Sequence, residues 1–134
     1  MEFRLLGALE ADERGRPVDL GTPRVRTLLA ALLLQANRVM SVDELVDRMW
    51  GEYPPANPRR TLQTNVARLR LALGEGAADL VRTRERGYVI EVEQWQLDLL
   101  TFRALVERAH PAEDPVRRLR LLEQALALWR GEPL

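Results

Sequence analysis

The eighteen residues from Asn57 to Gly74 combine helical periodicity with a complete absence of acidic side chains. Asn57 is a suitable N-cap, Pro58 fits the first helical position, and Gly74 is a typical stop signal. Apolar residues between them recur every three or four positions, which predicts a helix with one narrow buried stripe. The members of this stripe are Leu62, Val66, Leu69 and Leu73.

The opposite side of the same helix is polar and basic. At about 100° per residue, its guanidinium, amide and hydroxyl groups project away from the apolar stripe. A face with several Arg and no carboxylate is suited to the phosphates and base edges of DNA. An ordinary amphipathic surface helix with solvated Arg would show the same pattern. The residues expected on this face or on its flank are Arg60, Gln63, Thr64, Ala67, Arg68 and Arg70.

Composition sets the broad class of the protein. A hydrophobic content of 46% is typical of a globular chain, and 134 residues allow one domain, or a small domain with a fragment of another. The lack of Cys excludes disulfides and thiolate chemistry. No apolar run is long enough to span a membrane, and Met1–Glu10 lacks the basic and apolar regions of a signal peptide. We therefore expect a cytoplasmic protein with no membrane partner.

The net charge of zero hides an uneven distribution along the chain. Residues 1–55 hold seven Arg and nine acidic residues, whereas residues 56–90 hold seven Arg and three acidic residues. The second segment therefore carries a charge of +4, a modest electrostatic footprint for a polyanion. All 20 basic residues are Arg, which suits bidentate phosphate contacts, although GC-rich coding is the simpler explanation for the lack of Lys.

The segments before residue 57 predict a small sheet followed by two helices. Phe3–Ala11 is expected to be a strand, and Arg16–Leu20 a short strand that returns after a turn. A mostly apolar helix should begin after the N-cap Thr22, run to about Ala36 and form the buried centre of the fold. Residues 37–40 form a break that includes at most one short strand.

Ser41 and Glu44 have the spacing of a capping box, which predicts a second helix that ends at Gly51. A rigid Tyr-Pro-Pro turn then leads into the 57–74 helix, so the order helix, turn, helix is indicated by caps and breakers. Residues 80–93 alternate in polarity and predict a β-hairpin with Arg at its tip and first arm. A basic hairpin after a basic helix is typical of a winged helix, in which the helix enters the major groove and the hairpin reaches the adjacent backbone or minor groove.

Residues 97–134 predict two further helices, one ending near Ala109 and one covering Val116–Arg130. The second helix is apolar on more than one face. Two such helices cannot cover each other fully, so they resemble the first hairpin of a helical repeat that continues past Leu134 or packs on another surface. The main stripe of the second helix is expected to be Leu119, Leu122, Ala125, Leu126 and Trp129, with Leu121 and Leu128 off it.

Four segments, taken in order, resemble the Streptomyces antibiotic regulatory protein family. They are LLAALLLQANRVMSVDELVDRMWG, TLQTNVARLR, RGY and ALALWRGE. In that family an OmpR-type winged-helix DNA-binding domain is followed by a bacterial transcriptional activator domain, and the resemblance covers nearly the whole chain. The expected fold is therefore α+β: a winged helix-turn-helix over residues 1–93 and a helical hairpin of TPR-like type over residues 94–134, the latter the truncated start of an all-α domain.

The resemblance implies an activator of transcription, usually of a secondary-metabolite gene cluster such as one for an antibiotic. Such proteins bind direct repeats in double-stranded DNA near promoters and recruit RNA polymerase holoenzyme. Two copies would then lie head to tail on DNA. Because Met1 is followed at once by the first strand, we expect no receiver domain and no phosphorelay control.

The resemblance also assigns DNA-binding roles by motif. Gly87 and Tyr88 match the wing signature, and we interpret them structurally: Gly87 would permit the turn, and Tyr88 would anchor the return strand in the core. The two Arg of the recognition helix match Arg68 and Arg70. With the polar residues of the preceding turn and the remaining Arg of the helix and hairpin, the expected DNA-binding set is Arg60, Gln63, Thr64, Arg68, Arg70, Arg82, Arg84 and Arg86.

Other chemistry has little support in the sequence. The only Ser, Ser41, is better explained as a helix cap, and the only His, His110, has no second His or Cys nearby. No glycine-rich phosphate loop is present. We therefore expect no catalytic residues, no metal and no cofactor. The alternative from another class is a protein-interaction module in which residues 95–134 bind a partner and the winged helix is only a scaffold.

Overall fold

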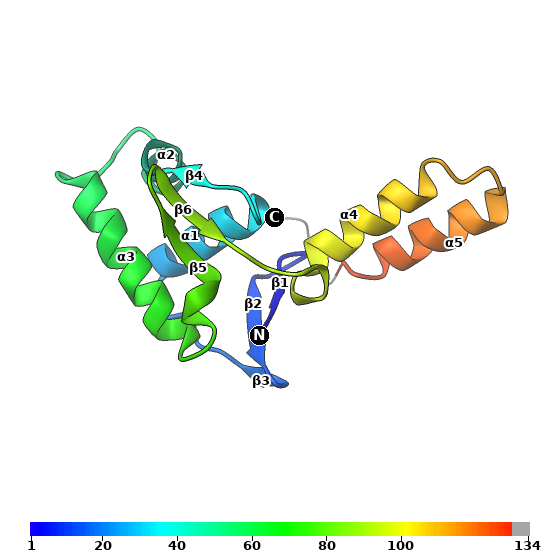
Figure 1. Cartoon of the computed structure of the whole chain (residues 1–134), viewed down its shortest axis with the longest axis horizontal. Coiled ribbons are helices and arrows are strands. Elements are labelled where there is room, and N and C mark those ends of the chain that lie inside the picture. Colours follow the sequence, from blue (N-terminus) through cyan, green and yellow to red (C-terminus); the bar gives the residue numbers. More distant parts are fainter. Residues whose placement is uncertain (130–134) are drawn as a thin grey trace. The chain divides into compact units, whose positions relative to one another are not determined.

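The computed structural model describes residues 1–129 and divides the chain into two compact units. One unit comprises residues 15–92. The other joins Met1–Arg14 to the chain from Glu93 onward. Figure 1 labels the elements of both units, which are described separately below.

The 15–92 unit has the helix-turn-helix and hairpin order expected from the sequence. Helix α1 contacts α2, α3 and strand β6, and its apolar residues are almost all buried, which confirms it as the central helix. The elements are β3 (Arg16–Pro17), α1 (Pro23–Leu34), β4 (Met40–Ser41), α2 (Val42–Trp50), α3 (Pro58–Leu73), a 3₁₀ helix (Ala78–Leu80), β5 (Val81–Arg84) and β6 (Gly87–Ile90).

Strands β4, β6 and β5 form an antiparallel sheet in that order, with β6 in the middle. Tyr88 of β6 lies opposite Met40 on one side and opposite Thr83 on the other, and its side chain is buried as expected. Asn37 holds the end of the hairpin, because its side chain donates to the Val92 carbonyl at 3.0 Å and accepts from the Val92 amide at 2.9 Å. The hairpin is therefore fastened at its base to the connection after α1.

Local capping explains where the three helices begin. The hydroxyl of Thr22 accepts from the amide of Val25, and the Asn57 side chain accepts from the amide of Arg60. Ser41 and Glu44 form the expected capping box, with distances of 3.0 and 3.4 Å between their reciprocal donors and acceptors. Gly51 and Gly74 are the C-caps of α2 and α3. The predicted helix-turn-helix is thus confirmed at its ends as well as in its order.

The second unit begins with a strand pair in place of the single strand expected over Phe3–Ala11. Strand β1 (Glu2–Arg4) pairs antiparallel with β2 (Glu10–Glu13), so the prediction of one continuous strand was wrong. The chain turns between them because the Asp98 carboxylate accepts hydrogen bonds from the amides of Leu5 and Leu6, at 2.8 and 3.1 Å. An acceptor more than ninety residues away takes the place of a strand partner.

Two helices complete this unit, preceded by a 3₁₀ helix (Gln94–Gln96): α4 (Asp98–Ala109) and α5 (Pro115–Leu126). They pack against each other, and the rings of Phe102 and Trp129 meet edge to face at 5.7 Å. Helix α5 ends before the expected Arg130, which lies outside the described residues.

The face of α5 that packs inward differs from the one expected. Leu121 and Ala125 are buried, whereas Leu119 and Leu126 are 57% and 64% exposed. The predicted stripe was therefore wrong except at Ala125 and the ring contact of Trp129. Because α5 is apolar on two faces, α4 can cover only one of them, and periodicity alone does not decide which.

The N-terminal strands belong to the same compact unit as the C-terminal helices. A boundary near residue 93 coincides with the end of the 15–92 unit, but Met1–Arg14 groups with the C-terminal helices through the contacts of Asp98 and a parallel bridge between Phe3 and Leu97. Among residues 1–129, no helix is long and apolar enough to cross a membrane.

Candidate nucleic-acid interface

Helix α3 has the two faces that its sequence predicts. Leu62, Leu69 and the rest of the apolar stripe are buried, and Leu62 and Leu69 are fully enclosed. The side chains of Arg60, Gln63, Thr64, Ala67 and Arg68 are exposed on the other side. No acidic residue interrupts this face, so it offers guanidinium, amide and hydroxyl groups to solvent without a carboxylate of its own helix. Leu71, which the sequence reasoning left unplaced, is 82% exposed beside them.

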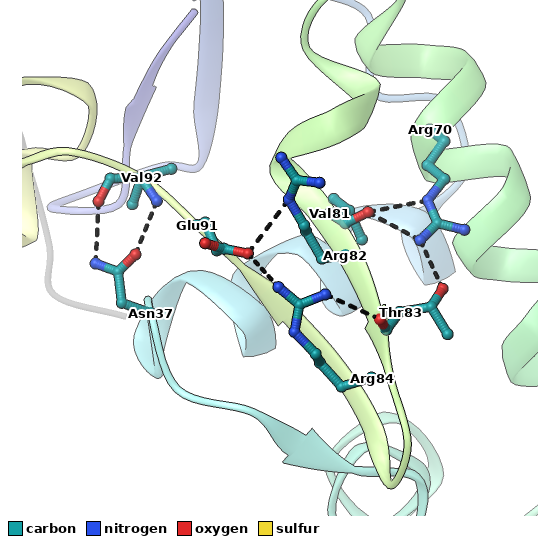
Figure 2. Close-up of polar contacts among 8 residues, drawn as sticks. All are labelled: Asn37, Arg70, Val81, Arg82, Thr83, Arg84, Glu91 and Val92. Atoms are coloured by element: carbon teal, nitrogen blue, oxygen red, sulfur yellow. Dashed lines mark hydrogen bonds and ion pairs between the residues drawn. The ribbon is translucent and has the colours of Figure 1, made fainter.

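Arg70 is used within the protein. Its Nε and Nη2 donate to the Val81 carbonyl at 3.1 and 2.8 Å, and Nη2 also donates to the Thr83 hydroxyl at 2.9 Å (Figure 2). The side chain is half-buried. A planar guanidinium suits this forked geometry, which ties the last turns of α3 to the first arm of the hairpin. Arg70 thus fixes the position of the β5–β6 hairpin relative to α3, a role that its family motif did not indicate.

Arg82 and Arg84 both form ion pairs with Glu91, the residue that directly follows strand β6. The Glu91 Oε1 lies 2.7 Å from Nη2 of Arg84 and 3.3 Å from Nε of Arg82 (Figure 2). Arg84 also donates through Nη1 to the carbonyl of Thr83 at 3.0 Å. All three charged side chains remain about half exposed, so both Arg keep access to solvent.

The wing tip and the start of α3 line the same hollow, which has a volume of about 170 Å³. Gln63 comes from the exposed face of α3, and Arg84 and Arg86 come from the hairpin. The structure therefore brings expected helix and hairpin residues to one surface. Arg59 also lines this hollow, although it is not among the residues expected from the sequence. Its position in the first turn of α3 was the available signal, since the N-terminus of a helix favours bound anions.

Gly87 has a different purpose from the one expected. Its φ is not positive, so the turn between β5 and β6 does not require glycine there. Instead, β4 passes close to it. An added Cβ would lie only 1.8 Å from the carbonyl oxygen of Met40 and 2.9 Å from the Ser41 Cα. The expectation that Gly87 permits the turn was wrong. Glycine at this position instead allows β4, the strand that leads into helix α2, to pass close to β6.

Among residues 1–129, acidic and His side chains do not cluster into a metal-binding site. Within the described part of the chain, no group of three or more His, Asp or Glu residues could hold a metal ion. Ser41 is occupied as the cap of α2. The site therefore offers exposed guanidinium and amide donors, with the Glu85 carboxylate beside them at the hairpin tip.

Comparison with protein families matches both parts of the chain. The model described as "Transcriptional regulatory protein, C terminal" matches residues 15–90, and the "Bacterial transcriptional activator domain" model matches residues 97–134. The first match coincides closely with the 15–92 unit.

Named relatives are similar over the full length of this chain. Regulatory protein AfsR of Streptomyces griseus is 36% identical over 137 residues, which are 14% of its own length. Transcriptional regulatory protein MoaR1 of Mycobacterium tuberculosis is 37% identical, with 45% of its length covered. Transcriptional regulator RedD of Streptomyces coelicolor is 36% identical, with 40% covered. The chain thus spans less than half of the length of each of these relatives.

A solved structure shows the same fold. Mycobacterium tuberculosis EmbR, described in complex with a low-affinity phosphopeptide, aligns with a TM-score of 0.85 and 33% sequence identity. The alignment covers 97% of this chain and 36% of the EmbR chain. The likeness extends through both the helix-turn-helix and the helical hairpin, and it confirms the predicted winged-helix fold.

Proposed function

Because this chain belongs to the transcriptional regulatory protein C-terminal family, with the domain order of the Streptomyces antibiotic regulatory proteins, we propose that its 15–92 unit binds double-stranded DNA in a sequence-specific manner. Helix α3 would lie in the major groove, and the β5–β6 hairpin would contact the adjacent backbone. The exposed α3 residues Arg60, Gln63, Thr64 and Arg68 would make the helix contacts, and Arg82, Arg84 and Arg86 the hairpin contacts. Arg70 would take part in the proposed interface indirectly, by holding the β5–β6 hairpin in place.

One observation carries this proposal more than any other. Side chains from the acid-free face of α3 and from the tip of the hairpin line one hollow, although they are about twenty residues apart in the sequence. A duplex presents bases and phosphates side by side, so a helix that reads bases needs phosphate-binding groups held at a fixed distance from it. The forked contact of Arg70 with Val81 and Thr83 supplies that fixed distance.

For the whole protein, we propose a transcriptional activator that acts in the bacterial cytoplasm, on a secondary-metabolite gene cluster. Two copies would bind direct repeats about one helical turn apart, in a head-to-tail arrangement, and recruit RNA polymerase holoenzyme. The relatives named as regulators support this proposal. A footprint over neighbouring promoters would identify the repeat, and protection of two sites on the same face of the duplex is the expected result.

Replacing Arg68 with alanine tests the reading face. We expect the affinity for the footprinted site to fall by about 1–3 kcal/mol, because a bidentate contact with a base edge is lost. Base preference at one position should relax at the same time. Fluorescence anisotropy with the site and with single-base variants measures both effects.

Arg68→Lys is the matched control for that experiment. Lysine retains the charge but not the planar fork, so it should preserve the dependence on salt and still lose sequence preference if Arg68 reads a base. A contact with phosphate alone would leave sequence preference intact in the lysine variant. If Arg68→Ala altered neither affinity nor preference, the proposed reading face would be refuted.

Replacing Arg86 with alanine tests the wing. Arg86 lies at the hairpin tip and forms no ion pair among residues 1–129. We expect weaker binding to every duplex, by a similar factor for specific and mixed sequences. The slope of log K against log salt concentration should become shallower by about 0.9 for the lost phosphate contact. An unchanged slope would exclude Arg86 from the interface.

The second candidate is a protein-interaction module centred on the helical hairpin. The exposed apolar residues Val116, Leu119 and Leu126 on α5 favour it, since an uncovered apolar face is typical of a contact surface. The two candidates differ in their dependence on α3. If sequence-specific DNA binding is lost in Arg68→Ala, the DNA-binding proposal is supported. If there is no DNA shift and the Arg68→Ala variant still binds a protein partner, the interaction module is supported.

A further inference from the structure

Glu91 occupies an unusual position for an acidic residue in a basic hairpin. Its side chain lies between the two arginines of the first arm, and its Oε1 accepts a hydrogen bond from Arg84 and forms an ion pair with Arg82 (Figure 2). The nearer contact, with Nη2 of Arg84, is 2.7 Å long. This is the length of a charge-assisted hydrogen bond, not of a loose surface pair.

The strand register accounts for this arrangement. Arg82 lies opposite Val89 and Arg84 lies opposite Gly87, so the two Arg project from the same face of the hairpin. Glu91 lies two residues after Val89, so its side chain projects from the same face of the hairpin as the two Arg. Gly87 has no side chain that could hold Arg84 near the tip, and the guanidinium is free to extend back to Glu91. The β-sheet geometry thus puts one carboxylate within reach of two cations.

Stability does not explain these ion pairs. The side chains of Arg82, Arg84 and Glu91 are 52%, 45% and 49% exposed, and ion pairs between side chains this exposed to solvent add little to stability. A carboxylate offers a guanidinium the same pair of anionic oxygen acceptors that a phosphate offers. A backbone phosphate that bound these two Arg would therefore need the same guanidinium donors that Glu91 contacts.

We infer that Glu91 is an intramolecular competitor of DNA phosphate that holds Arg82 and Arg84 in the DNA-free protein. The inference rests on the proposed DNA-binding function. Binding of the wing to a duplex then requires exchange of the carboxylate for phosphate, so the two arginines contribute less to affinity than free arginines would. The acid acts as a built-in restraint on electrostatic binding to DNA of any sequence.

Glu91→Gln tests the inference, with Asp79→Asn as the matched control. Asp79 lines a hollow together with Arg82 and Arg84 but forms no ion pair among residues 1–129, so its replacement removes an equal charge without removing a competitor. We expect Glu91→Gln to raise the affinity for a mixed-sequence 20-base-pair duplex by about five- to tenfold at 0.1 M salt, and to steepen the salt slope by about one unit. Asp79→Asn should change affinity by less than about twofold, as expected for a screened charge.

A background variant separates competition from simple charge repulsion. With both Arg82 and Arg84 replaced by alanine, the gain from Glu91→Gln should disappear, whereas any gain from Asp79→Asn should persist. Thermal unfolding of each variant should keep the wild-type midpoint, because the exposed pairs add little stability. Equal gains from the two acid replacements, or a gain that survives without the arginines, would overturn the inference. Weaker binding in Glu91→Gln would overturn it too, and would identify Glu91 as a group that pre-organises the wing.

The same measurements separate this inference from the proposed function. A wild-type chain that binds neither the mixed-sequence duplex nor the footprinted site would refute both. A wild-type chain that binds DNA, with Glu91→Gln indistinguishable from wild type, would refute the competitor alone and leave the DNA-binding proposal standing.

Discussion

Replacing Gly87 with alanine is expected to lower the unfolding free energy of the 15–92 unit by about 3 kcal/mol, since overpacking of a rigid site costs this much. The new methyl group would meet backbone atoms of β4, the carbonyl of Met40 and the Cα of Ser41, which cannot rotate away. Relief requires β4 to separate from β6 where Ser41 pairs with Gly87. Because Ser41 also caps α2, the start of that helix would be disturbed together with the sheet.

Denaturant unfolding of the full chain, followed by circular dichroism, measures this effect. Gly76→Ala is the matched control, because Gly76 has open space around its Cα and a φ of +83°. Its replacement should cost only the left-handed backbone penalty, about 1–2 kcal/mol. If Gly87→Ala proved no more destabilising than Gly76→Ala, the close approach of β4 would not be the reason for glycine at this position.

Leu62→Ala is expected to cost about 2–5 kcal/mol of unfolding free energy, the range for emptying a buried leucine site. Leu62 is fully enclosed and belongs to the stripe that holds α3 on the core. The same substitution at Leu71, in the same helix, should change stability by no more than about 0.5 kcal/mol, because that side chain is 82% exposed. The pair keeps the chemistry and the helix constant and varies only burial.

Comparable losses in the two leucine variants would contradict the assignment of the faces of α3, and with it the proposed reading surface. DNA binding provides a second check. Leu62→Ala should weaken binding only as far as it unfolds the domain, so added osmolyte that restores folding should restore affinity. Arg68→Ala should stay defective under the same conditions, since its fold is intact.

Local signals predicted most of the helix-turn-helix. The caps Thr22, Ser41 and Asn57 and the stop at Gly74 set helix ends that the structure confirms. Such signals work because a cap satisfies backbone donors within three residues of itself, whatever the rest of the chain does. The exposed polar face of α3 followed from the same short-range geometry, since its stripe has only one way to face a core.

Two features that depend on residues distant in the sequence were not predicted, and the reason is the same for both. The strand expected over Phe3–Ala11 breaks because Asp98 accepts from Leu5 and Leu6 across the chain. Arg70 matches a position expected to contact DNA, yet its side chain is held by Val81 and Thr83. In each case a partner distant in sequence competes with the local preference, and a one-dimensional pattern holds no record of that partner.

The sequence by itself determined the order of elements, the ends of the helices and the basic face of α3, because these depend on spacing and capping within one or two helical turns. Only the tertiary structure decided which face of α5 is buried, why Gly87 is glycine, and that Glu91 joins Arg82 and Arg84. These features depend on which strands and helices become neighbours. That choice is made by packing of the whole unit, in which one burial or pairing excludes another.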